Sequence, residues 1–494
     1  LAAAAHDLGK ANDHFQEMLR QRRNQGLRHE WATLLILNRP EVRDWLMPAV
    51  AGDCNDWQLV QWAIAGHHPA YNRPSPPPRA VGAGHEMNLL LAHEDFRACL
   101  IWLGKTFDIA KPPPSFTADV ALPLVGSRNV FAGHMQPWYR QAAQRWGEME
   151  DGERRFVAAV KNCLIAADIA GSALPKEVPN EQQRAAWIGQ AFANKPEMGD
   201  LVRVWKRRLG ANKLYPFQKD VGASTGPVTF VKAGCGSGKT LAAYLWAANQ
   251  YPTRRLYFCY PTTGTATEGY RDYLHPVEGD IDARLFHGRA EVDLEIILKT
   301  GADDERADAD AVARIESLDA WSTPIVSCTV DTVLGIVQNN RRGLYGWPAL
   351  AGASFVFDEI HAYDDKLFGA LLRFLEALRG VPVLLMTASL PAPRRKDLEE
   401  CLKRIGRHLS EVPGPALLEE RPRYHRQGEV DDRDPLPEVL AHVKEWKEQA
   451  KVLWICNTVD RAINAWERAS NALKEIGGEG APPIYHLSLI HISE

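Results

Sequence analysis

Ala233-Gly234-Cys235-Gly236-Ser237-Gly238-Lys239-Thr240 is a glycine-rich stretch that follows an apolar run, Val228–Val231, and precedes a helical run, Leu241–Ala248. A strand, a glycine loop and a helix in that order form a phosphate-binding loop, because loop N–H groups and the helix N-terminus face the anion. We expect Lys239 to reach the β- and γ-phosphates of a nucleotide and the Thr240 hydroxyl to bind Mg²⁺. Further nucleotide contacts are expected from Gly234, Gly236, Ser237 and Gly238. The alternative is an ordinary glycine turn, since Ala233 stands where the motif has glycine.

A pair of carboxylates argues against that alternative. Asp358 and Glu359 directly follow the apolar run Ala353–Phe357. The carboxyl ends of parallel strands are where open α/β sheets bind their ligands. We expect Asp358 to hold Mg²⁺ and Glu359 to orient the attacking water, in a reaction that depends on positioning and electrostatics. Together the loop and the pair predict hydrolysis of a nucleoside triphosphate, with ATP and Mg²⁺ as cofactors.

Composition sets broad limits on the class of protein. The chain has 494 residues, a net charge of −4 and eight cysteines without a C-x-x-C pair. Its length suggests about two to four domains, and its near-neutral charge leaves room for a local nucleic-acid groove. The cysteine pattern favours reduced thiols in a cytoplasmic protein. No apolar run approaches the roughly 20 residues that span a bilayer, so we expect no membrane association.

The periodicity of apolar residues changes along the chain. Residues 1–180 are predicted to be helical, with helix-period spacing in Trp31–Leu37, Trp57–Ile64, Met87–Leu103 and Phe156–Ala173. Residues 181–205 are expected to be a linker. Over residues 206–405 short β-rich runs alternate with helices, which predicts a parallel sheet. Its expected strands are Val228–Val231, Arg255–Tyr260, Ile325–Cys328, Phe355–Phe357 and Val383–Met386.

The C-terminal part is expected to hold a second linker, residues 406–437, and the start of another α/β unit over residues 438–494, opening with a strand at Lys451–Ile455. The first residue is Leu1, and about 45 residues follow that strand, fewer than a typical domain needs. We therefore expect a chain truncated at both ends. Residues 487–494 are expected not to be native sequence.

Further segments, in order, resemble the superfamily 2 helicases of the DExD/H type. They are Leu214–Gln218, whose Gln218 corresponds to the adenine-reading glutamine, Tyr260–Ala266 and Thr329–Thr332 at strand-contact motifs, and Thr387–Pro391 at the coupling motif. Thr/Ser clusters after strands are usually turns, so it is their order and spacing that carry the resemblance. It implies tandem α/β domains of the RecA type, the second incomplete here.

Within that superfamily, Asp358-Glu359-Ile360-His361-Ala362-Tyr363-Asp364 resembles the helicase-nuclease of type I CRISPR systems. In that family an HD nuclease domain precedes the helicase. The N-terminal His6-Asp7, followed by Gly9-Lys10, resembles the HD signature of metal-dependent phosphohydrolases.

The resemblance extends to a set of possible metal ligands. It implies that His6, Asp7, His29, His67, His68 and Asp168 hold metal, with Ser172 supporting the site and Lys10 neutralising a scissile phosphate. Histidine and carboxylate together suit Fe, Mn, Co, Ni or Zn. A two-metal site would activate water and stabilise both attacking and leaving oxygens of a phosphodiester. The family has one more metal-binding histidine, upstream of the His6-Asp7 pair and outside this chain. The number of metal ions that this chain holds therefore stays open.

The resemblance implies an ATP-driven, single-stranded DNA translocase with a metal-dependent DNA nuclease, recruited by an RNA-guided surveillance complex (Cascade). Target choice would then come from guide pairing. We expect a monomer. Two alternatives stay open. One is a superfamily 2 helicase whose HD domain hydrolyses nucleotides. The other is a catalytically impaired fragment that binds ATP or DNA, since the arginines that contact the γ-phosphate across the domain cleft are missing.

Overall fold

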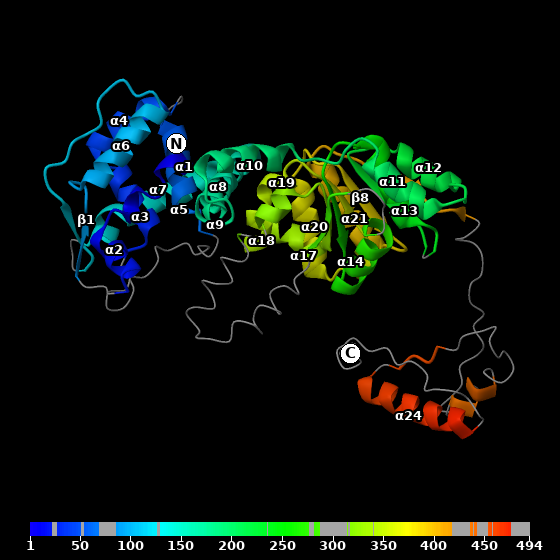
Figure 1. The fold of residues 1–494 in the computed structure, drawn as a ribbon. Helices are drawn as coiled ribbons and strands as arrows, with labels where there is room; N and C mark the ends of the chain where they lie inside the picture. Colours follow the sequence, from blue (N-terminus) through cyan, green and yellow to red (C-terminus); the bar gives the residue numbers. More distant parts are fainter. Residues whose placement is uncertain are drawn as a thin grey trace. The chain divides into compact units, whose positions relative to one another are not determined.

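The computed structural model (Figure 1) describes residues 1–21, 27–50, 54–68, 85–125, 129–234, 236–275, 281–286, 314, 317–338, 340–416, 435–437, 439–441, 453–456 and 458–475. The chain divides into two compact units, Leu1–Glu420 and Arg421–Glu494. The predicted proline-rich loop at 73–78, the acidic segment 302–310 and residues 487–494 lie outside the described residues.

The N-terminal part of the first unit is helical, with one small antiparallel sheet. The helices are α1 (Ala2–Ala5), η1 (Leu8–Lys10), α2 (Asp13–Leu19), α3 (His29–Leu37), α4 (Pro40–Leu46), η2 (Met47–Ala49), α5 (Cys54–Ala65), α6 (Glu94–Thr106), η3 (Phe131–Met135), α7 (Gln136–Glu148), α8 (Asp151–Ser172) and α9 (Leu174–Glu177). Strands β1 (Glu86–Leu89) and β2 (Val120–Pro123) pair with each other. Three of the four predicted helices are confirmed here, as α3, α5 and α8.

The predicted helix Met87–Leu103 is wrong over its first residues. Met87 and Leu89 are buried while their neighbours are not, so this segment alternates as strand β1. The helix begins only at Glu94, where the His93 side chain accepts a hydrogen bond from the Asp95 amide. Over four residues an alternating pattern and a helical one cannot be told apart.

The segment 181–205, expected to be a linker, contains helix α10 (Glu181–Ala193) and the first half of α11 (Asp200–Leu209). The buried Arg255 of the following domain contacts this segment. That guanidinium donates to the carbonyl oxygens of Ala191, Asn194 (3.0 Å) and Trp321. The segment is therefore folded and packed on the α/β domain. The hydrogen bonds that hold it come from residues distant in sequence, so no local sequence pattern predicts them.

The rest of the first unit is an α/β domain. Its seven described strands are all parallel, in the order β5-β6-β4-β7-β8-β3-β9. They are β3 (Val228–Lys232), β4 (Leu256–Tyr260), β5 (Ala283–Phe286), β6 (Ile325–Thr329), β7 (Ser354–Phe357), β8 (Val383–Thr387) and β9 (Leu409–Pro413). All five predicted strands are confirmed, while β5 and β9, with few buried residues, were not predicted.

Helices cover both faces of this sheet. They are α12 (Pro216–Ala223), α13 (Lys239–Gln250), α14 (Thr263–Gly269), η4 (Tyr270–Leu274), α17 (Val330–Leu334), η5 (Gly335–Gln338), α18 (Arg341–Tyr345), α19 (Trp347–Leu350), η6 (Ile360–Ala362), α20 (Asp365–Ala377) and α21 (Ala392–Arg404). Strand residues contribute to two hydrophobic cores. Phe258 lies in the same core as Trp246 of α13, and Phe355 lies in the same core as Phe374 of α20. The predicted architecture, a helical domain followed by an α/β domain, is confirmed.

Helix α8 joins the two domains of the first unit. Leu164 belongs to the core of the N-terminal helices, whereas Ile165 and Ile169 belong to the core shared with Phe355 and its neighbours. The stretch Asp151–Glu177 is long and apolar enough to cross a membrane by composition alone. Because α8 contributes to two cores, its apolar residues have a structural explanation, and the membrane criterion is weak evidence here.

The second unit is described mainly by helix α24 (Val459–Glu475). Residues 453–456, the described part of the predicted strand and its next residue, are not assigned to a strand. No described residue of this unit forms a β-sheet. The predicted start of a second RecA-like domain therefore stays a prediction.

Candidate nucleotide site and candidate metal centre

The phosphate loop lies where the sheet ends. Lys232, the last residue of β3, is in register with Thr387 of β8, and Phe357 of β7 is in register with Leu385. The loop after β3 and the Asp358-Glu359 pair after β7 therefore meet at one edge of the sheet. Gly236 and Gly238 have φ angles of 76° and 83°, a left-handed conformation that glycine adopts without steric cost.

Lys239 and Glu359 form an ion pair inside this loop. The Lys239 Nζ lies 3.2 Å from Glu359 Oε1 and donates to the Ala233 carbonyl oxygen at 2.9 Å. Glu359 has a φ of 47°, which non-glycine residues adopt rarely and mostly where function requires it. In this state the loop lysine is held by the protein's own acceptors in the place of a phosphate.

Asp358 is a buried carboxylate next to this ion pair. Burial, and then the neighbouring Glu359, raise the pKa of Asp358 to about 7, against the lowering effect of Lys239. Its Oδ1 accepts from the Glu359 amide at 2.9 Å. A buried carboxylate that resists ionisation is stabilised in its charged form by a cation, so Asp358 fits the Mg²⁺ role predicted for it.

Gln218 lies against the loop. Its Nε2 donates to the Gly238 carbonyl at 3.3 Å, and its Oε1 accepts from the Tyr215 amide at 2.9 Å. A side chain on Gly238 would strike this amide group, since a Cβ there would lie 2.4 Å from Gln218 Nε2. Gln218 therefore lies beside the phosphate loop and is hydrogen-bonded to it. Its predicted contact with a nucleobase would be made from this position.

A hydrogen bond connects the carboxylate pair to the next strand end. His361 Nδ1 lies 3.1 Å from Glu359 Oε2 and 3.0 Å from Thr387 Oγ1. Thr387 in turn donates to the Ser389 carbonyl at 2.6 Å. The predicted coupling segment is therefore linked, through His361, to the residue expected to orient the attacking water.

Sequence reasoning missed one residue at this site. Burial raises the pKa of Tyr273, on η4, while the neighbouring side chains of Arg208 and Thr240 lower it, so its hydroxyl lies beside the phosphate loop. Tyr273 has no motif signal, because it belongs to an irregular turn after α14. It stacks on the buried Tyr244, with ring centroids 5.2 Å apart, and its position follows from that packing.

The predicted metal ligands come together from distant parts of the chain. His6 and Asp7 follow α1, His29 opens α3, His67 and His68 follow α5, and Asp168 lies on α8. The packing of α3 on η1 is tight, because a Cβ at Gly9 would lie 2.0 Å from the His29 carbonyl oxygen. Thr33, also on α3, accepts from the Gly9 amide at 2.8 Å and donates to the His6 carbonyl oxygen at 2.7 Å.

Distances within this cluster are those of groups facing one small volume. Asp7 Oδ1 lies 3.4 Å from the Nε2 atoms of both His6 and His29, and Asp168 Oδ1 lies 3.7 Å from His6 Nε2. His68 Nε2 lies 3.3 Å from His29 Nε2. The ligand atoms of His29, His67 and His68 all lie within 4.8 Å of one another.

Several of these atoms are buried without a hydrogen bond. His6 Nε2, Asp7 Oδ1 and His67 Nε2 have no partner among the described residues. Meanwhile the other ring nitrogens are fixed, because His6 Nδ1 bonds the Ala3 carbonyl and His67 Nδ1 bonds the Ile64 carbonyl. Buried atoms left without partners cost free energy. A transition metal satisfies such nitrogen and carboxylate atoms, and ligating histidines commonly bond through their other nitrogen, so the residues fit a metal.

The electrostatics of the cluster favour neutral imidazoles. Burial lowers the pKa of His29 to about 3, of His67 to about 4 and of His68 to about 2. Neutral imidazole is the form that binds metal. Burial would raise the pKa of Asp168, but the nearby His6 ring, 3.7 Å away, and the Arg314 guanidinium hold it well below its usual range.

Two predicted supporting residues are in place. Lys10 Nζ lies 2.6 Å from Asp7 Oδ2 at a partly exposed position. Ser172 does not touch the Asp168 carboxylate; its hydroxyl donates to the Asp168 backbone carbonyl at 2.8 Å.

Two further residues were not predicted. Glu30 is fully buried, pairs with Arg28 and lies 3.6 Å from His29 Nδ1. Arg314, from the α/β domain, lies 2.9 Å from Asp168 Oδ2. Neither residue has a sequence signal. Glu30 follows His29 in an ordinary helix, and Arg314 is 146 residues from its partner Asp168.

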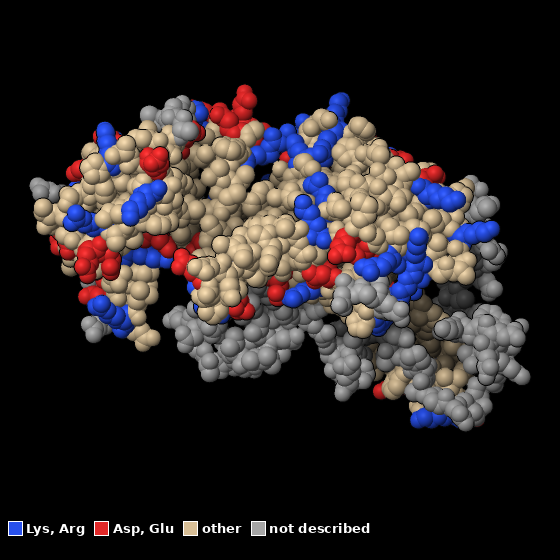
Figure 2. Space-filling model, turned by 45° about the horizontal axis from the view of Figure 1, so that its top comes forward, with Lys and Arg blue, Asp and Glu red and all other residues tan. Residues whose placement is uncertain are grey.

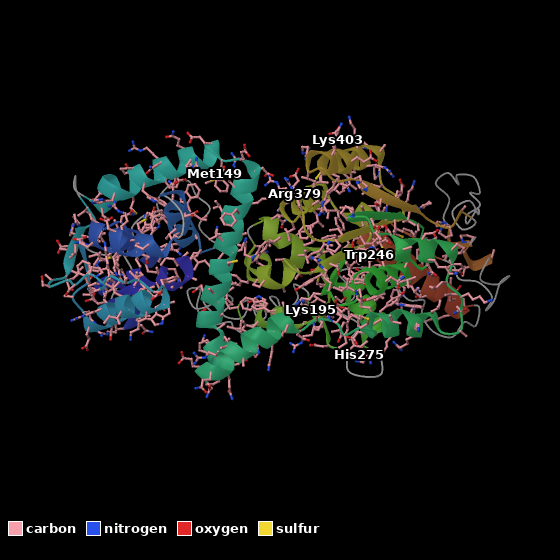
Figure 3. The ribbon with its side chains drawn as sticks, turned by 90° about the horizontal axis from the view of Figure 1, so that it is seen from above. Met149, Lys195, Trp246, His275, Arg379 and Lys403 are labelled. Carbon is pink, nitrogen blue, oxygen red and sulfur yellow. The ribbon has the colours of Figure 1, made fainter. Side chains whose placement is uncertain are left out.

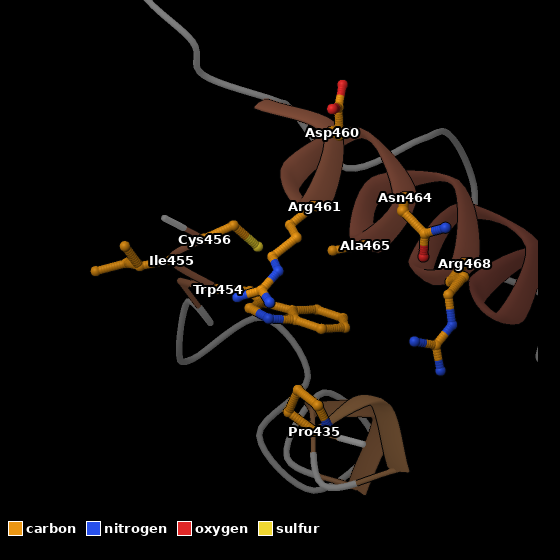
Figure 4. Close-up of a pocket in the computed structure, with 9 residues that line it drawn as sticks. All are labelled: Pro435, Trp454, Ile455, Cys456, Asp460, Arg461, Asn464, Ala465 and Arg468. Carbon is orange, nitrogen blue, oxygen red and sulfur yellow. The ribbon is translucent and has the colours of Figure 1, made fainter. Parts of the chain in front are cut away.

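Among the described residues, the surface and the C-terminal unit add no third candidate site. In Figure 2, acidic and basic side chains are interspersed over the described residues of one face, so no broad basic field dominates it. Figure 4 shows a pocket in the second unit, lined by residues that include Trp454, Arg461 and Arg468. None of the predicted site residues lines that pocket.

Comparisons with known proteins find similarity to helicases and to nuclease/helicases. A DEAD/DEAH box helicase model matches residues 215–398. A Myxococcus xanthus protein named as a CRISPR-associated nuclease/helicase Cas3 is 43% identical over 476 residues, which are 95% of this chain and 61% of that protein. The CRISPR-associated endonuclease/helicase Cas3 of Thermus thermophilus is 29% identical over 60% of this chain and 35% of its own length.

Solved structures show the same fold. The crystal structure of T. fusca Cas3-AMPPNP superposes with a TM-score of 0.53 at 17% identity, covering 98% of this chain and 57% of that chain. The T. fusca Cas3 structure alone gives a TM-score of 0.54 at 18% identity, with 97% and 57% covered. This chain thus spans about three fifths of its M. xanthus and T. fusca relatives.

Proposed function

We propose that this chain, which is similar to the CRISPR-associated nuclease/helicases named Cas3 and matches a DEAD/DEAH box helicase model, couples ATP-driven movement on single-stranded DNA to metal-dependent DNA cleavage. The proposal includes degradation of invading DNA in antiviral defence. The observation that carries it is the presence of two chemically distinct sites in one compact unit, Leu1–Glu420.

In the helicase half, the chain's own residues divide the work. Lys239 would exchange Glu359 and the Ala233 carbonyl for the β- and γ-phosphates. Glu359, released from that ion pair and lying 3.1 Å from His361 Nδ1, would then orient the attacking water. Mg²⁺ bound with ATP supplies charge neutralisation at Thr240 and Asp358. The His361–Thr387 contact of 3.0 Å gives nucleotide hydrolysis a direct route to the coupling segment.

Contacts to a DNA backbone would come from hydroxyls at the strand ends. Thr262 and Thr265 bond each other at the start of α14, and Thr329 bonds Thr332 at the end of β6. Such groups donate to phosphate oxygens without reading sequence. This suits an enzyme that tracks any single strand, while target choice is left to guide pairing in a surveillance complex.

In the N-terminal half, metal would be held by Asp7, His6 and Asp168 on one side, and by His29, His67 and His68 on the other. A bound divalent transition metal supplies a hydroxide at neutral pH. Lys10, partly exposed and 2.6 Å from Asp7, lies where it can bind a phosphate oxygen of the scissile strand. Burial lowers the pKa of His29, His67 and His68, so these three imidazoles stay neutral, which is the form that binds metal.

A second candidate function shares the same metal centre: hydrolysis of mononucleotides rather than DNA. The two differ in substrate, which makes them separable by experiment. The Lys239→Ala chain removes nucleotide turnover at the phosphate loop, and Mn²⁺ then reports on the histidine cluster alone. We expect this variant to cleave single-stranded DNA and to leave ATP, dATP and dGMP intact.

The matched control is the double variant Lys239→Ala, Asp7→Asn, which removes a carboxylate that lies 3.4 Å from two of the histidines. It should lose the DNA cleavage. Turnover of mononucleotides by Lys239→Ala, with DNA left intact, would refute the nuclease proposal in favour of the phosphohydrolase.

A further inference from the structure

Arg314 reaches from the α/β domain to helix α8. Its Nη1 lies 2.9 Å from Asp168 Oδ2 and 2.7 Å from Ser172 Oγ, so it bonds two successive turns of that helix. The side chains of Arg314 and Asp168 are only 14% and 16% exposed. A pair this well shielded from solvent is held more firmly than a surface salt bridge.

The arginine is also fixed on the side of its own domain. Its guanidinium lies over the ring of Tyr345, 5.5 Å from the centroid. Tyr345 is buried, and its carbonyl accepts from the indole of Trp321 at 2.8 Å. The position of the guanidinium is therefore set by the α/β core, and α8 receives it.

Asp168 divides its two oxygens between the domains. Oδ1 faces His6 Nε2 at 3.7 Å, and Oδ2 faces Arg314. Ser172 donates to the Asp168 backbone carbonyl and accepts from Arg314. Asp168 and Ser172, one turn apart, together form a two-point receptor for a guanidinium, which gives the spacing of this pair a physical reason.

We propose that Arg314 is a positioning residue of the metal centre, supplied by the helicase domain, which holds the Asp168 carboxylate in its metal-binding orientation. The inference rests on the proposed metal-dependent function of the histidine cluster. At this centre Arg314 bonds Asp168 and Ser172, so we expect it to act through the Asp168 carboxylate.

Two opposing effects decide the sign of its contribution. A guanidinium near a dication repels it, which weakens metal binding. An outer-shell partner that fixes a ligand's orientation strengthens binding, and removing such a partner usually costs about 10–100-fold in metal affinity. The Arg314–Asp168–Ser172 geometry, with both hydrogen bonds under 3 Å, favours the second effect. Because coupling is reciprocal, metal binding would also strengthen the contact between the helicase domain and α8.

The test measures metal affinity rather than activity. Mn²⁺ is titrated into the whole chain without nucleotide, and free Mn²⁺ is followed by electron paramagnetic resonance. Arg314→Ala is expected to raise the dissociation constant by about 10–100-fold. Arg314→Lys should recover part of the loss, since an ammonium restores the charge but not the planar fork. Ser172→Ala should give a smaller loss, because it leaves the Asp168–Arg314 ion pair intact.

A matched control exists on the same helix. Arg379, also from the α/β domain, pairs with Asp151 at the start of α8. Figure 3 shows α8 running from near Met149 between the N-terminal helices and the α/β domain, with Arg379 on the side of that domain. Arg379→Ala loosens the same helix 17 residues away from Asp168 in sequence, and should leave the Mn²⁺ affinity unchanged.

The outcomes separate the inference from its premise. Failure of the unmodified chain to bind Mn²⁺ would remove the proposed function itself. If the unmodified chain binds and Arg314→Ala binds equally or more tightly, Arg314 is not a positioning residue. An equal loss in Arg379→Ala would assign the effect to general loosening of α8. If Arg314→Ala has a lower melting temperature than the unmodified chain in EDTA, its folding is impaired. The Arg314→Lys and Ser172→Ala variants then provide the test, and Mn²⁺ affinity equal to that of the unmodified chain in both would refute the positioning role.

Discussion

At the residue scale, both sites hold groups that are under-satisfied without a ligand. Lys239 pairs with Glu359 in the place of phosphate, and His6 Nε2, Asp7 Oδ1 and His67 Nε2 are buried without hydrogen bonds among the described residues. Motif residues were predictable because their chemistry is tied to spacing. Their partners were not, because Glu30, Tyr273 and Arg314 are selected by tertiary packing.

Tyr273 provides a test at this scale. Tyr273→Phe removes the hydroxyl that lies beside Thr240, the residue expected to bind Mg²⁺. One neutral hydrogen bond is worth about 0.5–1.5 kcal/mol. We therefore expect kcat/KM for Mg-ATP hydrolysis to fall about 2–10-fold.

Tyr270→Phe is the matched control. It lies on the same turn, but its hydroxyl donates to the Ala283 carbonyl at 3.1 Å, away from the nucleotide site. Equal effects from both variants would show that Tyr273 only supports the turn.

At the scale of elements, one buried side chain, Arg255, helps to anchor the interval 181–205 on the α/β domain. Arg255→Leu leaves the carbonyl oxygens of Ala191, Asn194 and Trp321 without their donor. A hydrogen bond to a charged group contributes about 1.5–3 kcal/mol. We expect the free energy of unfolding in urea to fall by at least about 3 kcal/mol, since more than one such bond is lost.

Arg254→Leu, next along the chain, removes one hydrogen bond to the Ala353 carbonyl and should cost clearly less. A larger loss for Arg254→Leu would contradict the importance assigned to Arg255.

The contacts of Arg255 also show why the sequence alone predicted a linker at residues 181–205. Pro175 and Pro179, which lie just before residue 181, and several charges gave this region a loop-like composition, whereas Arg255 lies more than 60 positions after the Ala191 and Asn194 carbonyls to which it donates.

The sheet shows the same limit. Strands β3, β4, β6, β7 and β8 were predicted because they are almost continuously buried, which leaves long apolar runs. Strands β5 and β9 lie at the two edges and are only partly buried. Edge strands need few apolar residues, so their sequences carry little periodic signal.

At the scale of the first compact unit, α8 makes one body of two functional halves. It contributes to both cores, carries Asp168, and receives arginines from the α/β domain at both ends. The order of domains was predictable from motif order. The packing of α8 between them was not, because its apolar surface is consistent with one core as well as two.

The central claim is that this chain carries two separable activities. The direct measurement follows cleavage of single-stranded DNA with Mn²⁺, with and without ATP, beside DNA-stimulated ATP hydrolysis, for Lys239→Ala and Asp7→Asn. We predict that Lys239→Ala loses ATP hydrolysis and every ATP-dependent increase in degradation but still nicks DNA. Asp7→Asn should lose nicking and keep ATP hydrolysis. If either substitution abolishes both activities in a folded chain, the two sites are not independent and the account is contradicted.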